Sequence, residues 1–147
     1  MKVEIATLND IDKLCDLLTT LFEQEVEFKA DKKIQKKALT MIIKNPVQGH
    51  ILIAKDGDNI VGMLTLLYTI STALGSKVAV LEDMIISKEH QSRGIGTLLV
   101  LYAKSFAKEN ECKRITLLTD FDNIKAHKFY EINGFTKSTM IPFRIVL

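Results

Sequence analysis

Two glycines separated by one residue stand where an apolar segment gives way to a segment with a helical pattern. They belong to residues 91–96, QSRGIG. The first N–H groups of a helix lack partners within the helix, and the helix dipole adds partial positive charge there. Glycine lets a bulky anion approach the backbone, and Arg93 can add a charge-assisted hydrogen bond. These residues predict a phosphate-binding loop, although a plain turn with a helix cap is the commoner explanation of two glycines alone.

Two well-known nucleotide-binding motifs do not fit this loop. A Walker A loop needs GxxxxGK[ST], and the sequence contains no such run. A dinucleotide fingerprint needs a third glycine, but Leu99 stands at that position. The acidic residue expected on the following strand is also missing from residues 114–119, RITLLT. The loop therefore predicts an anion site of another kind.

Two carboxylates interrupt the apolar segment that precedes the loop. Glu82 and Asp83 lie within residues 78–87, VAVLEDMIIS. A charged group in such a strand costs free energy unless it is paired or hydrated, so these side chains are expected to face a cleft. Neighbouring strand residues point to opposite faces, so only one of them would reach a site in a regular strand. The alternative is that one or both pair with a basic residue for structural reasons.

A third group of polar residues recurs at helical spacing near the C-terminus. Asn123, then Ala126 or His127, then Tyr130 follow at steps of three and four residues, so they share one face of a helix. For Tyr130 the alternative is a half-buried helix tyrosine whose hydroxyl meets water. Phe129 is interpreted as a core residue.

The apolar periodicity predicts which elements hold these groups. The helix after the loop is the clearest, because residues 95–107 carry an apolar stripe at helical spacing. The connection between the first two helices holds Glu23, Glu25 and Glu27, which could form an acidic rim, although a solvated charge run is the commoner explanation. The other expected elements are a strand at 3–5, helices at 11–22 (with a capping-box spacing at Asn9 and Asp12) and 31–44 (with Ala38, Met41 and Ile42 inward), two strands within 50–69 joined at Asp56-Gly57, strands at 78–87 and 114–119, a helix at 123–133, and closing strands at 135–139 and 143–147.

The order of elements and the composition bound the class of protein. The expected strands and helices follow one another with no repeat and no linker, which predicts a single α/β domain over residues 1–147 around a mixed sheet. The 20 basic and 18 acidic residues give a net charge of only +2, so no nucleic-acid partner is predicted. No apolar run is long enough to span a membrane, and the start lacks a signal peptide, so a cytoplasmic location is expected. The cysteines and histidines have no metal-ligand spacing, so no metal is expected.

The loop at residues 91–96 and the segment at residues 122–135 together resemble motifs of the GNAT superfamily of acetyl-CoA-dependent N-acetyltransferases. Gln91, Gly94 and Gly96 fit the family's [Q/R]-x-x-G-x-[G/A] signature after the fourth strand. A second stretch, residues 122–135, is similar to the family pattern N-x-x-A-x-x-[FL]-Y-x-x-x-G-F. The resemblance covers nearly the whole chain. It implies a mostly antiparallel sheet with a parallel βαβ splay.

The resemblance also implies a function and its residues. It implies transfer of an acetyl group from acetyl-CoA to a primary amine, with Tyr130 as general acid and Glu82, or alternatively Asp83 or water alone, as general base. An amine with a pKa near 10 must lose a proton before it attacks, which is why a base is needed. No nucleophilic cysteine is required. The residues expected to hold acetyl-CoA are Met84, Ile85 and Ile86 through their main chain, together with Gln91, Ser92, Arg93, Gly94, Ile95, Gly96, Thr97, Asn123, Ala126 and Tyr130.

Several points stay open at the level of sequence. The amine acceptor has no motif, and it could be a small molecule or a peptide. Homodimers are common in the family, so a homodimer is open. The competing function is a non-catalytic acyl-CoA-binding sensor or partner module that keeps the phosphate loop without turnover.

Overall fold

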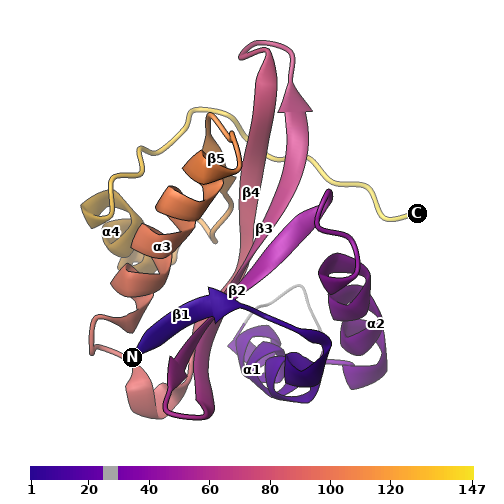
Figure 1. The fold of residues 1–147 in the computed structure, drawn as a ribbon. Helices are drawn as coiled ribbons and strands as arrows, with labels where there is room; N and C mark the ends of the chain where they lie inside the picture. Colours follow the sequence, from indigo (N-terminus) through magenta and orange to yellow (C-terminus); the bar gives the residue numbers. More distant parts are fainter. Residues whose placement is uncertain (25–29) are drawn as a thin grey trace.

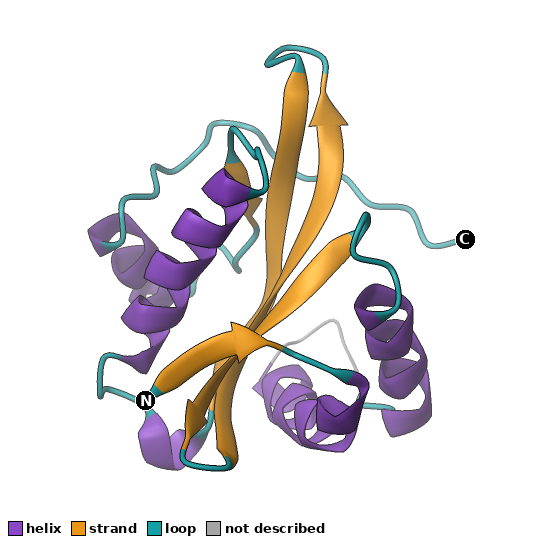
Figure 2. Cartoon of the chain, viewed as in Figure 1, coloured by secondary structure: helices purple, strands orange, loops and turns teal. Residues whose placement is uncertain are grey.

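A five-stranded sheet lies at the centre of the protein (Figures 1 and 2). The computed structural model describes residues 1–24 and 30–147. The strands lie in chain order, the first three pairings are antiparallel, and the last is parallel, which confirms the mixed, mostly antiparallel sheet. The strands are β1 (Lys2–Ile5), β2 (Gly49–Asp56), β3 (Asn59–Ser71), β4 (Ser76–Ile86) and β5 (Ile115–Leu117).

Helices cover both faces of this sheet. In Figure 1, α1 and α2 lie to the right of the strands, and α3 and α4 lie to the left. None of the described helices is long and apolar enough to cross a membrane. The helices are α1 (Ile11–Gln24), α2 (Lys32–Ile43), α3 (Ile95–Glu109) and α4 (Ile124–Ile132), with short 3₁₀ turns η1 (Leu8–Asp10) and η2 (Lys88–His90).

The sheet separates two hydrophobic clusters. Ile51 and Ile53 of β2 pack with α1 and α2, whereas Leu52 and Ala54 pack with α3. Successive strand residues point to opposite faces, so a strand that is covered on both sides is apolar at every position. This explains why residues 51–54 form a continuous apolar run rather than an alternating one.

The start of α1 differs from the prediction. The capping box joins Thr7 and Asp10 ahead of the helix, not Asn9 and Asp12. The Asp10 carboxylate accepts hydrogen bonds from the Thr7 N–H at 2.7 Å and from the Thr7 hydroxyl at 3.0 Å. The prediction was wrong by two residues because the 3₁₀ turn η1 precedes α1 and takes the cap itself.

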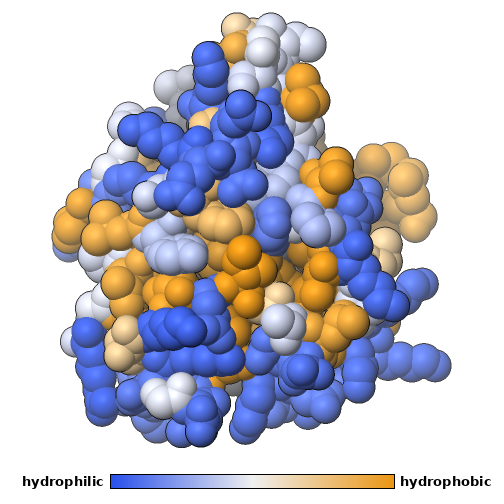
Figure 3. All heavy atoms as spheres, in the orientation of Figure 1, coloured by the Kyte–Doolittle hydropathy of each residue, from blue (hydrophilic) through white to orange (hydrophobic). Residues whose placement is uncertain are grey.

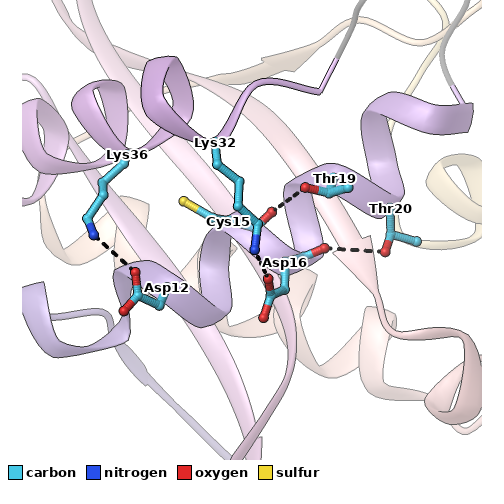
Figure 4. Close-up of polar contacts among 7 residues, drawn as sticks. All are labelled: Asp12, Cys15, Asp16, Thr19, Thr20, Lys32 and Lys36. Carbon is cyan, nitrogen blue, oxygen red and sulfur yellow. Dashed lines mark hydrogen bonds and ion pairs between the residues drawn. The ribbon is translucent and has the colours of Figure 1, made fainter.

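Ion pairs join α2 to α1. The Lys32 ammonium lies 2.7 Å from the Asp16 carboxylate, and the Lys36 ammonium lies 3.1 Å from that of Asp12 (Figure 4). All four side chains are exposed, so these pairs add little stability.

The buried face of α2 was predicted in the wrong register. Gln35 and Leu39 are its buried residues, while Ala38 and Met41 are exposed. Gln35 and Leu39 are four residues apart and therefore lie on one face. Ile42 packs against the same cluster as Leu39, as expected. The apolar residues of α2 surround more than one face, so the pattern alone did not select the buried one.

The connection between β2 and β3 follows the predicted turn. Gly57 in the β2–β3 turn and Gly75 in the β3–β4 turn have left-handed φ angles of 59° and 60°. Helix α3 buries Leu99, Ala103 and Ala107 as expected, but Leu98 and Tyr102 of the same predicted stripe lie at the exposed rim.

The two closing strands predicted at the C-terminus are not present. Residues 135–147 contain no helix or strand, and their path leads away from β5 (Figure 1). A strand exists only where a second strand pairs with its backbone, and the apolar alternation of this segment does not say which strand that would be. The predicted strand at 114–119 is also shorter, since β5 pairs only over residues 115–117.

Candidate functional site

A cleft opens where β4 and β5 stop pairing. The ladder joins only Ala79 to Leu81 with Ile115 to Leu117, whereas β4 continues to Ile86. Beyond Leu81 this edge of β4 has no strand beside it among the described residues. The cleft has a volume of about 540 Å³ and is lined by Gln24, Met84, Ile85, Ile86, His90, Gln91, Ser92, Gly94, Ile95, Gly96, Thr97, Asn123, Lys125, Ala126, Phe129 and Tyr130.

The glycine loop forms one end of this cleft. Ser92 and Gly94 have left-handed φ angles of 61° and 79°, and Gly94 is the residue before the first turn of α3. The side-chain amide of Gln91 donates a hydrogen bond of 3.1 Å to the carbonyl of Ile86, which ties the loop to the end of β4. The N-terminal N–H groups of α3 consequently lie at the cleft, where an anion would be stabilised.

The two glycines serve different purposes. A Cβ atom on Gly94 would meet nothing within 4 Å, so glycine is needed there for its left-handed backbone. A Cβ atom on Gly96 would lie 3.2 Å from the Phe129 ring and 3.3 Å from the Met84 methyl group. Gly96 therefore allows α4 and the β4 side chains to approach α3 closely at the floor of the cleft.

Helix α4 presents the predicted face to the cleft. The side-chain oxygen of Asn123 accepts a hydrogen bond of 3.1 Å from the Ala126 N–H, so Asn123 caps this helix. Asn123, Ala126 and Tyr130 all line the cleft. His127, the alternative to Ala126, instead lies 2.9 Å from the Asp120 carbonyl through its ring nitrogen.

Tyr130 meets β4 across the cleft. Its hydroxyl donates to the Met84 sulfur at 3.8 Å, and its ring lies edge-on to Phe129 and Phe135 at centroid distances of 5.2 and 5.7 Å. Burial raises the pKa of the phenol. The hydroxyl therefore remains protonated at neutral pH and can act as a proton donor.

A β-bulge at Asp83 and Met84 interrupts the pairing of β4 with β3. Thr65 pairs with Glu82 and Met63 with Ile85, so two residues of β4, Asp83 and Met84, stand against one on β3. Asp83, in this bulge, has a left-handed φ of 53°. Without the bulge, Glu82 and Met84 would share a face.

The bulge sends Glu82 and Met84 to opposite faces of the sheet. Met84 packs with the cluster under α3, whereas Ile85 packs with the cluster under α1. Glu82 is opposite Thr65, on the α1 face, and is exposed. Glu82 and Asp83 thus lie beside the cleft at the point of divergence, but neither is among the residues that line it.

Arg93 and Glu23 are not among the residues that line the cleft. Arg93 lines a smaller neighbouring depression of about 180 Å³, together with Asp56 and His90. His90 and Gly94 line both hollows, so the loop separates them. Glu23 is exposed at the end of α1, and the predicted rim residues Glu25 and Glu27 lie outside the described residues.

Four lining residues were not predicted: Gln24, His90, Lys125 and Phe129. Phe129 was interpreted as core, and its contact with the site of Gly96 explains why it also borders the cleft. Lys125 lies in the first turn of α4 and lines the cleft together with the first residues of α3. No sequence signal could identify Gln24, because α1 reaches the cleft only in the folded chain.

The charges around the cleft suit an anionic ligand. Its described lining includes Lys125 and no aspartate or glutamate, and the first turn of α3 carries no acidic residue. The described residues contain no cluster of histidine, cysteine, aspartate and glutamate that could hold a metal ion. The cleft therefore suits a ligand that carries an anionic group near the N-terminus of α3.

The chain is similar to proteins of one family. The sequence pattern described as the acetyltransferase (GNAT) family matches residues 11–135. An uncharacterized N-acetyltransferase, YhfO of Bacillus subtilis (strain 168), is 30% identical over 125 residues, which cover 83% of each chain. A structure described as a transcriptional regulator from Bacillus halodurans C-125 is 28% identical, with a TM-score of 0.83 and 99% of each chain covered.

A further solved structure shares the fold. It is an aminoglycoside acetyltransferase, meta-AAC0020, from an uncultured soil metagenomic sample, in complex with sisomicin. It is 21% identical, with a TM-score of 0.81, and the match covers 99% of this chain and 95% of that one.

Proposed function

The chain belongs to the acetyltransferase (GNAT) family, and we propose that it transfers the acetyl group of acetyl-CoA to a primary amine. The observation that carries the proposal is the cleft beside the end of β4, beyond its pairing with β5, which ends at the N-terminus of α3. We take residues 1–147 as one N-acetyltransferase domain.

The cleft offers a place for each part of acetyl-CoA, which supplies an activated thioester when bound. The N-terminal N–H groups of α3 and the loop residues 91–96 would hold the pyrophosphate, with Arg93 beside them. The main chain of Met84, Ile85 and Ile86, on the unpaired edge of β4, would bind the amides of the pantetheine arm as a strand binds a peptide. Asn123, Ala126 and Tyr130 form the opposite wall.

Tyr130 is proposed as the general acid. Its hydroxyl lies in the cleft beside Met84 and keeps its proton because burial raises its pKa. A thiolate that leaves needs a proton or a hydrogen bond, and a phenol in this position can supply either.

Glu82 is proposed as the general base, acting through water. It is exposed at the bulge where β4 leaves β5, so water can connect it with an amine at the cleft. Asp83 is the alternative general base, since it lies next to Glu82 at the bulge of β4. Water without a carboxylate is the third alternative.

Direct attack by the amine is favoured over a covalent intermediate on the protein. Neither Cys15 nor Cys112 lines the cleft. Burial raises the pKa of both thiols, so neither is activated as a thiolate.

The acceptor is proposed to be a cationic amine, either a small molecule or a peptide. The similarity to an aminoglycoside acetyltransferase supports an amino sugar as one member of the panel to be tested. The alternative, a non-catalytic acyl-CoA-binding module, would keep the loop and the cleft and lack turnover.

Thiol release from acetyl-CoA separates the two functions. The purified chain is incubated with acetyl-CoA and a panel of polyamines, amino acids, aminoglycosides and peptides, and free thiol is measured. An enzyme releases thiol only with some amines and yields an acetylated product of the corresponding mass. Binding of acetyl-CoA without amine-dependent release would establish the non-catalytic alternative.

A further inference from the structure

His90 stands between the cleft and the smaller depression beside the glycine loop. It lines both hollows, and it is the residue before Gln91, where the loop begins. In Figure 3 hydrophilic atoms predominate at the lower end of the molecule, where Figure 1 places the β2–β3 turn and η2. The His90 side chain is 25% exposed, so its ring exchanges protons with water. A histidine in this position can change its charge beside an anion site near neutral pH.

The ring of His90 has a polar partner at each of its nitrogens. Nδ1 lies 2.8 Å from the hydroxyl oxygen of Ser87, and the backbone N–H of His90 donates to the Ser87 carbonyl at 2.9 Å. Nε2 lies 3.9 Å from the carboxylate of Asp56, the last residue of β2. His90 therefore connects η2 to the β2–β3 turn, two segments that are far apart in the sequence.

The glycine loop is anchored at its start. Ser87 is fixed to the sheet, because its N–H donates to a carbonyl of β3 at 2.8 Å. His90 bonds to Ser87, and the Gln91 side chain bonds to the end of β4. The side chains of Ser92 and Arg93, which follow, form no hydrogen bond or ion pair with another described residue. The position of the loop therefore depends on the contacts that His90 and Gln91 make.

Protonation of His90 changes these contacts and the charge at the cleft. Both ring nitrogens then donate, one to the Ser87 hydroxyl and one toward the Asp56 carboxylate. The ring also adds a positive charge beside the N-terminal N–H groups of α3, where an anion is already favoured. Protonation thus strengthens the anchor of the loop and the attraction for an anion together.

The groups around His90 do not cancel this charge. Cationic groups outnumber the carboxylates among the described residues of the two hollows and of η2, so a further positive charge adds to an existing excess. These groups are the carboxylates of Asp56 and Glu89, the side chains of Lys88, Arg93 and Lys125, and the N-terminal amino group of Met1.

We propose that His90 is a positioning residue that strengthens the binding of acetyl-CoA at the glycine loop when its ring is protonated. The inference rests on the proposed binding of acetyl-CoA and adds a pH dependence that originates in the protein. An anion at the loop favours the protonated ring, so affinity rises as the pH falls through the ordinary titration range of histidine, about pH 6.5. The gain is expected to be about threefold to fivefold, as for a partly exposed ion pair.

Calorimetric titrations of acetyl-CoA at about pH 5.5 and about pH 8, on either side of the ordinary titration of histidine, test the proposal. His90→Gln keeps a hydrogen-bonding side chain but cannot become charged. A phosphate monoester on the ligand titrates in the same range, but the ratio of wild-type to variant affinity removes its share because both proteins bind the same ligand. We expect this ratio to be near one at the higher pH and about threefold to fivefold at the lower. His127→Gln changes a histidine that does not line the cleft, and this control should match the wild type at both pH values.

Asp56→Asn, alone and combined with His90→Gln, tests the connection to the β2–β3 turn. The effects of the two substitutions on acetyl-CoA affinity should be non-additive at the lower pH, where the two groups form a charged pair, and additive at the higher pH. If wild type binds acetyl-CoA but the ratio to His90→Gln is the same at both pH values, or the two effects are additive at both, the inference alone is overturned. Absence of acetyl-CoA binding by the wild type at both pH values would remove the proposed function and the inference with it.

Discussion

Tyr130 and Met84 bring helix α4 and strand β4 together at one point of the cleft. The phenol has no charged neighbour among its described contacts, and burial alone raises its pKa. A group with a raised pKa keeps its proton to higher pH than an ordinary tyrosine, so its ability to donate is lost only above about pH 10. The alkaline limit of turnover is therefore expected above about pH 10, as steady-state thiol release measured against pH would show.

Replacement of Tyr130 by phenylalanine removes this proton and leaves the ring. Turnover is expected to fall by about two orders of magnitude, the range of a general acid, while acetyl-CoA affinity changes little. Steady-state thiol release and a calorimetric titration measure the two quantities. Tyr102→Phe, on the exposed rim of α3, is the matched control and should leave both unchanged. Full turnover in Tyr130→Phe would remove Tyr130 as the acid.

Replacement of each carboxylate at the bulge by the corresponding amide shows which of the two acts as the general base. Glu82→Gln is expected to lower kcat/KM and shift its acidic limb to higher pH, because the amine must then lose its proton without a base. Asp83→Asn is the control, since asparagine tolerates the left-handed backbone at this position. Measurement of kcat/KM from about pH 6 to about pH 10, the range that spans the ordinary pKa values of histidine and of an amine, decides between them. A normal profile for Glu82→Gln with a shifted one for Asp83→Asn would exchange their roles.

The residue types of the site could be predicted, but their contacts could not. The spacing of Asn123, Ala126 and Tyr130 was sufficient to place them on one helix face, and that face lines the cleft. Their partners come from β4, a distant part of the chain, so no spacing could show that Tyr130 meets Met84 or that Gly96 accommodates Phe129.

At the scale of elements, the β4–loop–α3 unit positions the anion site. Gly94 has a left-handed φ and open space where a Cβ atom would stand, and so does Gly75 in the β3–β4 turn. Alanine in the left-handed region costs about 1–2 kcal/mol, so Gly94→Ala and Gly75→Ala should destabilise the protein to a similar degree in urea unfolding. Only Gly94→Ala is expected to weaken acetyl-CoA binding, by tenfold or more, because it alone reorients the N–H groups at α3. Equal affinities in the two variants would exclude the loop from binding.

Elements fixed by local pattern were predicted, and those fixed by distant partners were not. The β2–β3 hairpin and α3 follow from a turn signal and an apolar stripe within one segment. The bulge at Asp83 and the fate of residues 135–147 depend on which strand lies alongside, which local sequence does not encode. The buried face of α2 likewise depends on how α1 and β2 meet it.

At the scale of the whole molecule, the sheet separates a packed hydrophobic core on one face from the open cleft on the other. Its α1 face is packed around Leu14, Ile51 and Met63, while the divergence of β4 from β5 leaves a cleft open between α3 and α4. The packed half keeps β4 rigid, so its free edge can act as a fixed template for an extended ligand.

The binding of acetyl-CoA in this cleft is the central claim, and a calorimetric titration tests it most directly. Ala126 lines the cleft, so Ala126→Trp fills it, whereas Ala38→Trp adds the same ring to an exposed position on α2. We predict that the wild-type chain and Ala38→Trp bind one acetyl-CoA per chain with equal affinity and that Ala126→Trp, folded by circular dichroism, binds none. Absence of binding by the wild-type chain, or equal binding by Ala126→Trp, would contradict the claim.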